Sequence, residues 1–338
     1  MPSAMNDIAR AAQLLHAGEL VAFPTETVYG LGADAHNPIA LEKIFAAKGR
    51  PADHPLIVHL PDASHLGDWA IDIPAAAHTL AAACWPGPLT LILKRHPSVP
   101  DLVTGGQNTV GVRVPNHPVA LALLREFGSG IAAPSANKFG RISPTTAAHV
   151  KEELGESLET SVAMILDGGA CAVGIESTIV DMTSATPRIL RPGAISANTL
   201  RQLLHAPVHD SHAAQQTDNA MHIPRVSGSL AAHYAPRTSL QLCAVESLPA
   251  AIAAALQQGQ RVAVLAPELS PPLLANQHVI RRIASADFSQ FAHDLYATLR
   301  EFDAADCDLI LVTTPPDNEA WRAVNDRLHR AATGSGNK

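Results

Sequence analysis

Apolar positions in the first two hundred residues switch repeatedly between two spacings. Ile8, Ala11, Ala12 and Leu15 recur at helical spacing, whereas Val110-Gly111-Val112-Arg113-Val114 alternates with the period of a strand. Further short apolar runs, bounded by proline, glycine or polar residues, predict strands at 20–23, 56–60, 89–93, 131–133, 163–166, 177–182 and 188–190. Strands that alternate with helices in this way indicate an α/β fold.

The pattern changes near residue 205. Residues 206–238 are rich in His, Gln, Ser, Asp and Pro and lack periodicity, which predicts a linker. From residue 239 to 338 strands and helices alternate again, which predicts a smaller α/β domain with a mostly parallel sheet. We therefore expect a first domain at 1–205, the linker at 206–238 and a C-terminal domain at 239–338.

Composition narrows the function classes. The formal net charge of −7 argues against a general nucleic-acid or membrane-surface binder, so any anion site must be local. No apolar run is long enough to span a membrane. The four cysteines lie far apart without paired spacing, which predicts a reduced, cytoplasmic protein without a disulfide or zinc framework. The 17 histidines show no metal-ligand spacing, so we predict no metal site built by the protein.

The strongest candidate for chemistry is the polar stretch Pro24–Gly32, which follows an apolar run and is itself followed by Lys48-Gly49-Arg50-Pro51. Glycines let a backbone approach a ligand closely, and two cations fixed by a stiff turn suit a phosphorylated ligand. A solvated helix end would also favour cations. The stretch therefore favours a site for a small polar molecule beside a nucleotide.

Other polar residues interrupt or follow the predicted strands. Arg113 projects from a valine strand, where it could clamp a carboxylate or guard a sheet edge. Ser135 and Asn137 follow a strand end, the place where open α/β sheets bind ligands. Ser143 suits a helix cap or a phosphate contact, and His59 suits a satisfied core residue or a ligand contact. Spacing alone thus predicts a ligand-binding α/β protein.

Taken in order, these motifs resemble those of the L-threonylcarbamoyladenylate synthases, in the two-domain form with a YrdC-like catalytic domain. The resemblance covers nearly the whole chain. It is carried by Pro24–Gly32, Lys48-Gly49-Arg50-Pro51, Pro55-Leu56-Ile57, Trp85-Pro86-Gly87-Pro88-Leu89-Thr90, Val112-Arg113-Val114-Pro115, Pro134-Ser135-Ala136-Asn137, Ser143-Pro144-Thr145, Glu176-Ser177-Thr178-Ile179 and Arg191-Pro192-Gly193.

The resemblance implies a fold and a reaction. The fold is a twisted mixed sheet with a concave pocket, joined through a linker that crosses the active site to a smaller, Rossmann-like α/β domain. The reaction converts L-threonine, bicarbonate and ATP to threonylcarbamoyl-AMP, pyrophosphate and water. This is the first step in forming threonylcarbamoyladenosine (t6A37) in tRNA.

The resemblance also implies roles for particular residues, and the cations Lys48 and Arg50 would be catalytic. Threonine would be held by Thr27, His59, Arg113, Ala133 and Ser177. ATP would be held by Lys48, Arg50, His54, Thr109, Ser135, Asn137, Ser143, Arg191 and Tyr234, with His54 standing where relatives commonly carry Asn. The ATP phosphates would carry Mg²⁺, and no side chain would be a covalent nucleophile.

Two other functions agree with parts of the sequence. A concave basic surface could belong to an RNA-binding module, but the net acidity and the lack of basic and aromatic residues interleaved disfavour it. A carbamoyltransferase-type maturation component would be expected to carry zinc-finger-like cysteines, which this chain lacks. For the synthase we expect partners in the downstream tRNA threonylcarbamoyltransferase machinery, no membrane, and no requirement for tRNA contact.

Overall fold

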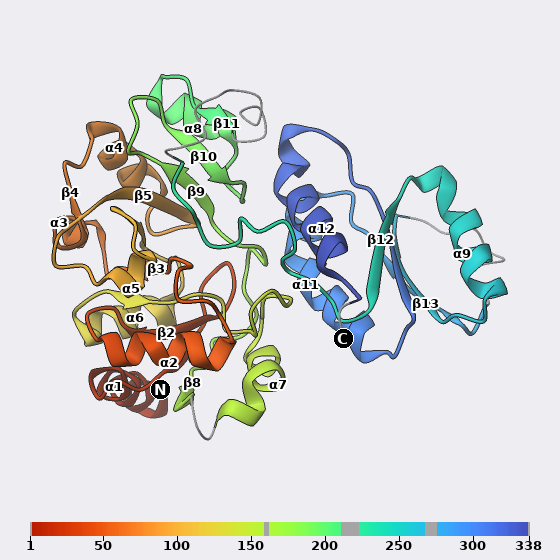
Figure 1. The fold of residues 1–338 in the computed structure, drawn as a ribbon, viewed down its shortest axis with the longest axis horizontal. Coiled ribbons are helices and arrows are strands. Elements are labelled where there is room, and N and C mark those ends of the chain that lie inside the picture. The colour runs from red at the N-terminus through yellow and green to blue at the C-terminus, as the bar shows by residue number, and fades with distance from the viewer. Residues whose placement is uncertain (1, 159–161, 211–222, 268–275, 337–338) are drawn as a thin grey trace. The chain divides into compact units, whose positions relative to one another are not determined.

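The structure is a computed structural model that describes residues 2–158, 162–210, 223–267 and 276–336. The chain divides into two compact units (Figure 1). The first unit comprises residues 1–139 and 144–229, and the second comprises 140–143 and 230–338. The short segment 140–143 therefore belongs with the C-terminal part of the chain, although it lies far from it in sequence.

The described part of the first unit is built on an 11-stranded mixed sheet. Its strands follow the order β11-β10-β9-β5-β6-β3-β7-β2-β1-β8, and β4 pairs with β5 beside this path. The strands are β1 (Val21–Phe23), β2 (Gly30–Asp34), β3 (Ile57–His59), β4 (Ala70–Ile71), β5 (Leu89–Arg95), β6 (Thr109–Arg113), β7 (Ile131–Ala132), β8 (Met164–Ile165), β9 (Thr178–Asp181), β10 (Arg188–Arg191) and β11 (His209–Asp210). Parallel and antiparallel pairs both occur, which confirms the predicted mixed sheet.

Helix α2 of the first unit follows the ordinary capping rules. Helix α2 begins at Pro38 after Asn37, whose side chain accepts hydrogen bonds from two backbone N–H groups, and it ends at Gly49 with φ 62°. Gly49 thus turns the chain between Lys48 and Arg50. The α-helices are α1 (Pro2–His16), α2 (Pro38–Lys48), α3 (Leu66–Trp69), α4 (Ala75–Cys84), α5 (Asp101–Thr104), α6 (Pro118–Phe127), α7 (Ala147–Leu158) and α8 (Ala197–Leu204).

The two faces of the central strands differ in character. Val58 of β3 pairs with Val112 of β6, and both lie in the main apolar core. Successive residues of a strand point to opposite faces, so His59 and Arg113, which also pair, lie together on the other face. Gly111 lies two residues before Arg113 on the same face, where it has no side chain to cover the strand. We call it the polar face, since it carries buried charged side chains.

Part of the polar face is covered by residues 223–229, which we call the covering segment. Its Val226 packs in an apolar cluster with Ile92, Ile179 and Leu190. Gln107 exchanges two hydrogen bonds with the backbone of Arg225, at 2.7 and 3.1 Å. The segment falls within the predicted linker; residues 211–222 of that linker lie outside the described residues.

The second unit contains a four-stranded parallel sheet in the order β12-β15-β13-β14. Its strands are β12 (Ser239–Cys243), β13 (Val262–Ala266), β14 (Val279–Ile283) and β15 (Leu309–Thr313), and its described α-helices are α9 (Leu248–Gln257), α11 (Phe288–Ala304) and α12 (Arg322–Gly334). Helix α9 lies on one side of the sheet, and α11 and α12 lie on the other (Figure 1). This confirms the expected smaller parallel α/β domain.

Two further observations concern the described residues of both units. None of their helices is both long and apolar enough to cross a lipid bilayer. All four cysteines are described, and each is a free thiol. Burial raises the pKa of Cys171 to about 12, which keeps this thiol protonated and unreactive near neutral pH.

Candidate functional site

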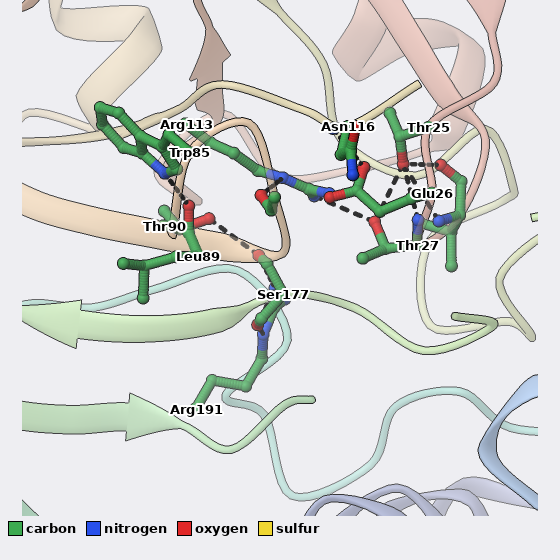
Figure 2. A network of polar contacts seen from close by, with 12 residues as sticks. Thr25, Glu26, Thr27, Trp85, Leu89, Thr90, Arg113, Asn116, Ser177 and Arg191 are labelled. Atoms are coloured by element: carbon green, nitrogen blue, oxygen red, sulfur yellow. Dashed lines mark hydrogen bonds and ion pairs between the residues drawn. The ribbon is translucent and has the colours of Figure 1, made fainter. Parts of the chain in front are cut away.

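Arg113 lies at the centre of a buried polar network on the first unit (Figure 2). Its Nη2 forms an ion pair of 2.6 Å with Glu26 Oε1, its Nη1 donates to Thr27 Oγ1 at 3.0 Å, and its Nε donates to the Gly87 carbonyl at 3.2 Å. Arg113 is only 4% exposed and Glu26 only 5%. A guanidinium has five N–H groups, so two of them have no partner among the described residues.

The loop that carries Thr27 is held by its own hydroxyl groups. Thr25 Oγ1 donates to the Val28 carbonyl at 2.7 Å and lies 2.9 Å from Thr27 Oγ1. Because the Thr25 proton is committed to Val28, Thr27 donates to Thr25 and accepts from Arg113. The hydroxyl of Thr27 is therefore oriented by two neighbours that come from different parts of the chain.

His59 lies beside Arg113 on β3 and is 4% exposed. Burial, with a smaller contribution from the Arg113 charge, lowers the pKa of His59 to about 3. The imidazole is therefore neutral at physiological pH. It meets the ring of Phe23 edge-on with the ring centroids 5.9 Å apart, so His59 has both an apolar contact and a polar edge at the site.

A second cluster lies where β9 begins. Ser177 Oγ lies 2.8 Å from Thr90 Oγ1, and Arg191 Nη2 donates to Ser177 Oγ at 3.1 Å and to the Ser177 carbonyl at 3.0 Å (Figure 2). Arg191 Nη1 also donates to the carbonyl of Ser227 in the covering segment, at 2.9 Å. Arg191 thus joins the sheet to the segment that covers it.

Lys48 is buried at the end of α2, with 2% exposure. Its Nζ donates to the carbonyl oxygens of Ser135 and Asn137, at 2.6 and 2.5 Å. Burial and, next, the charge of Arg50 hold the pKa of Lys48 well below its usual value. An ammonium has three donors, so one remains without a partner among the described residues. Lys48 therefore fixes the loop that carries two other predicted ligand contacts.

Arg50 and His54 both lie against Phe139. The Arg50 guanidinium carbon is 5.5 Å from the Phe139 ring centroid, and the His54 ring lies edge-on to the same ring at 5.1 Å. Arg50 Nη2 also donates to the Pro55 carbonyl at 2.8 Å. Burial and the Arg50 charge lower the pKa of His54. Phe139 N donates to the Lys48 carbonyl at 2.8 Å, which joins this cluster to the loop held by Lys48.

The remaining predicted residues lie in three places. Thr109 lines a small hollow beneath the covering segment, beside Gly111. Ala133 is buried, and its N–H donates to the Ile57 carbonyl at 3.0 Å. Ser143 and Tyr234 both belong to the second unit, where each is buried.

Tyr234 is held firmly within that unit. It has a left-handed backbone, with φ 61°, which is uncommon for a residue other than glycine. Its ring stacks on Tyr296 at 5.8 Å, and the Arg327 guanidinium lies 5.0 Å from its ring centroid. The side chain of Tyr234 is thus positioned by helices α11 and α12 of the second unit.

The structure adds residues to which the sequence assigned no role. Glu26 pairs with Arg113, Thr90 meets Ser177, and Ser227 accepts from Arg191. Glu26 lies inside the Pro24–Gly32 motif, so its position carried a signal. Its partner is 87 residues away in the chain, and only the fold could identify it.

Comparisons with known proteins agree over nearly the whole chain. The family model described as "Telomere recombination" matches residues 13–193, and the "Threonylcarbamoyl-AMP synthase, C-terminal domain" model matches residues 195–333. The threonylcarbamoyl-AMP synthase of Bacillus subtilis is 42% identical, covering 97% of this chain and 93% of the relative. That of Pyrococcus abyssi is 37% identical, covering 95% and 93%. Among solved structures, P. abyssi Sua5 complexed with L-threonine matches with a TM-score of 0.86 and 35% identity, covering 98% of this chain and 95% of that one.

Proposed function

This chain belongs to the threonylcarbamoyl-AMP synthase family, and we infer that it forms threonylcarbamoyl-AMP from L-threonine, bicarbonate and ATP, with release of pyrophosphate and water. The observation that carries this inference is the match of both family models and of full-length relatives to one chain. The buried cations of this unit give the reaction its physical basis, since L-threonine, bicarbonate and ATP each carry a negatively charged group.

We place L-threonine at the network around Arg113. The two uncommitted N–H groups of Arg113 suit bidentate binding of the α-carboxylate. Thr27 and His59, which lie next to Arg113, are proposed as further contacts, together with Ala133 and Ser177. The neutral imidazole of His59 can accept or donate a hydrogen bond without adding charge beside Arg113. The similar P. abyssi Sua5 structure contains L-threonine, which agrees with an amino-acid site in this family.

ATP is proposed to bind along the loop fixed by Lys48. The third donor of Lys48 suits a phosphate oxygen, and Arg50, His54, Ser135 and Asn137 adjoin the same loop. Thr109 and Arg191 extend this set along the polar face. The sequence-based assignment of Ser143 and Tyr234 to ATP remains a prediction.

A divalent cation bound to the phosphates of ATP is compatible with this arrangement. The described residues hold no cluster of three or more His, Cys, Asp or Glu side chains that could bind a metal. We propose that Mg²⁺ is carried by the ATP phosphates, where it would lower the negative charge that an attacking anion meets. The protein's own contribution would then be cationic side chains and not metal ligands.

The proposed chemistry requires two anions to meet. Bicarbonate yields CO₂ and hydroxide. The unprotonated amine of threonine adds to this CO₂ to give an N-carboxylate, and the proton that the amine releases forms water with the hydroxide. An oxygen of that carboxylate then forms a bond to the α-phosphorus as the bond to the leaving pyrophosphate breaks. Coulomb repulsion between these anions is large in a site shielded from water. Lys48, Arg50 and Arg191, all nearly buried, would offset it by charge stabilisation and positioning.

The experiment that tests this function is an assay of pyrophosphate release by the purified full-length chain. Pyrophosphate should appear only when L-threonine, bicarbonate and ATP are all present, and mass spectrometry should detect threonylcarbamoyl-AMP. Release that does not require threonine would reject the proposed reaction. We further propose a cytoplasmic location and transfer of the product to a tRNA threonylcarbamoyltransferase system, which a reconstituted tRNA modification assay would test.

A further inference from the structure

We propose that Glu26 is a positioning residue of the amino-acid site, which acts by holding the guanidinium of Arg113. This inference rests on the proposed function of Arg113 in binding threonine. Glu26 does not need to touch the substrate for this role. Its effect would pass through one ion pair and one backbone contact, both of which are buried.

The first observation is that both oxygens of the Glu26 carboxylate are engaged by different elements. Oε1 pairs with Arg113 Nη2 at 2.6 Å, and Oε2 accepts from the backbone N–H of Asn116 at 3.0 Å. Asn116 follows the end of β6, the strand that carries Arg113. The carboxylate therefore fixes the arginine head and the turn behind it at the same time.

The second observation is that the backbone of Glu26 is also fixed by a hydrogen bond. The Glu26 carbonyl accepts from the Val173 N–H at 2.7 Å, and Glu26 lies next to Thr27, which also contacts Arg113. Three groups thus converge on the guanidinium: the Glu26 carboxylate, the Thr27 hydroxyl and the Gly87 carbonyl. With these three donors committed, the two remaining N–H groups have a defined direction, as a bidentate carboxylate site requires.

Charge gives a physical reason for an acid at this position. A buried arginine without a partner is strongly unfavourable when the site is empty. Glu26 neutralises Arg113 within the free protein, and the pair then offers a site of zero net charge. An α-amino acid zwitterion can enter such a site without leaving an unbalanced buried charge. The pair therefore suits an amino acid better than a ligand that carries a carboxylate alone.

Glu26→Gln is the sharpest test, because glutamine keeps the shape but has only one side-chain oxygen. It can accept from Arg113 or from Asn116, and not from both. We expect the KM for L-threonine to rise about tenfold or more, as for loss of one charge-assisted hydrogen bond. The KM for ATP should stay within about twofold of the wild type, because the ATP residues lie in another cluster. Glu19→Gln, which removes an exposed acid paired with Lys43, is the matched control.

A double-mutant cycle separates positioning from general structural damage. If Glu26 acts through Arg113, then adding Glu26→Gln to an Arg113→Ala variant should leave the threonine KM unchanged within about twofold. A purely structural role predicts additive losses, an equal rise in both KM values and a lower unfolding temperature in either background. An unchanged or lower threonine KM in the single variant would overturn the proposal. If the wild-type chain releases no threonine-dependent pyrophosphate, then the proposed function itself has failed.

Discussion

The buried histidine beside Arg113 leads to a quantitative prediction about stability and pH. His59 is 4% exposed, and burial lowers its pKa from 6.5 to about 3. The unfolded chain can protonate this histidine below about pH 6.5, whereas the folded chain cannot do so until about pH 3. Between these values the unfolded state binds one more proton. Acid should therefore destabilise the fold through His59, and stability should rise with pH across this window.

The magnitude follows from the size of the shift. Linkage between proton binding and folding lowers the free energy of unfolding by about 1.4 kcal/mol for each pH unit below about pH 6.5. Between about pH 7.5 and about pH 5.5, His59 should lower the free energy of unfolding by about 1.4 kcal/mol, and by about pH 4.5 the loss should reach about 2.7 kcal/mol. His59→Gln removes the titrating group, so this variant should lack that portion of the acid sensitivity.

The assay is urea unfolding at about pH 7.5 and at about pH 5.5, followed by tryptophan fluorescence. A Trp321→Phe background leaves Trp69 and Trp85 as reporters within the first unit. The comparison is between the pH-dependent losses of the wild type and of His59→Gln, so any constant cost of the substitution cancels. His78→Gln, at an exposed position of the same unit, is the control and should behave as the wild type. Equal pH dependence with and without His59 would refute the reasoning.

Three other substitutions test individual residues of the first unit. Lys48→Ala should lower turnover by at least about 10²-fold through lost charge stabilisation, whereas Lys43→Ala on the same helix should not; normal activity of the first variant would count against its role. Arg113→Ala should weaken L-threonine binding by about 10- to 100-fold in calorimetry, as expected for lost charge-assisted hydrogen bonds, and unchanged affinity would contradict the carboxylate assignment. Gly193→Ala would place a Cβ 2.3 Å from the first backbone nitrogen of β9 and should lower the free energy of unfolding by at least about 1–3 kcal/mol. Gly67→Ala is the control, because open space surrounds that position. Equal unfolding temperatures of the two variants would argue against this crowding.

Several features could be predicted from the sequence because they depend on near neighbours. The alternation around Val112 fixed which side chains enter the core and which share a face with Arg113. Asn37-Pro38 and Gly49 marked the ends of helix α2, since capping and left-handed backbone have local causes. The ordered motifs were sufficient to identify the family, which the comparisons then showed.

Long-range partners could not be predicted in the same way. The sequence indicated that Lys48 and Arg113 are cations near a ligand, but not that Lys48 is committed to two backbone carbonyls or that Arg113 is neutralised by Glu26. Hydrogen bonds and ion pairs form between groups that the sheet order brings together, whatever their separation in the chain. Burial likewise depends on the completed fold, so the lowered pKa of His59 has no signature in its neighbours.

The sequence by itself determined the elements, the apolar faces of the strands and the family to which the chain belongs. Only the tertiary structure decided which charges meet, which donors remain uncommitted, and that residues 140–143 belong with the second unit. The physical reason is that the interactions behind these features act over different separations along the chain. Propensity and periodicity act over a few residues, whereas electrostatic and hydrogen-bond partners are set by distances in space.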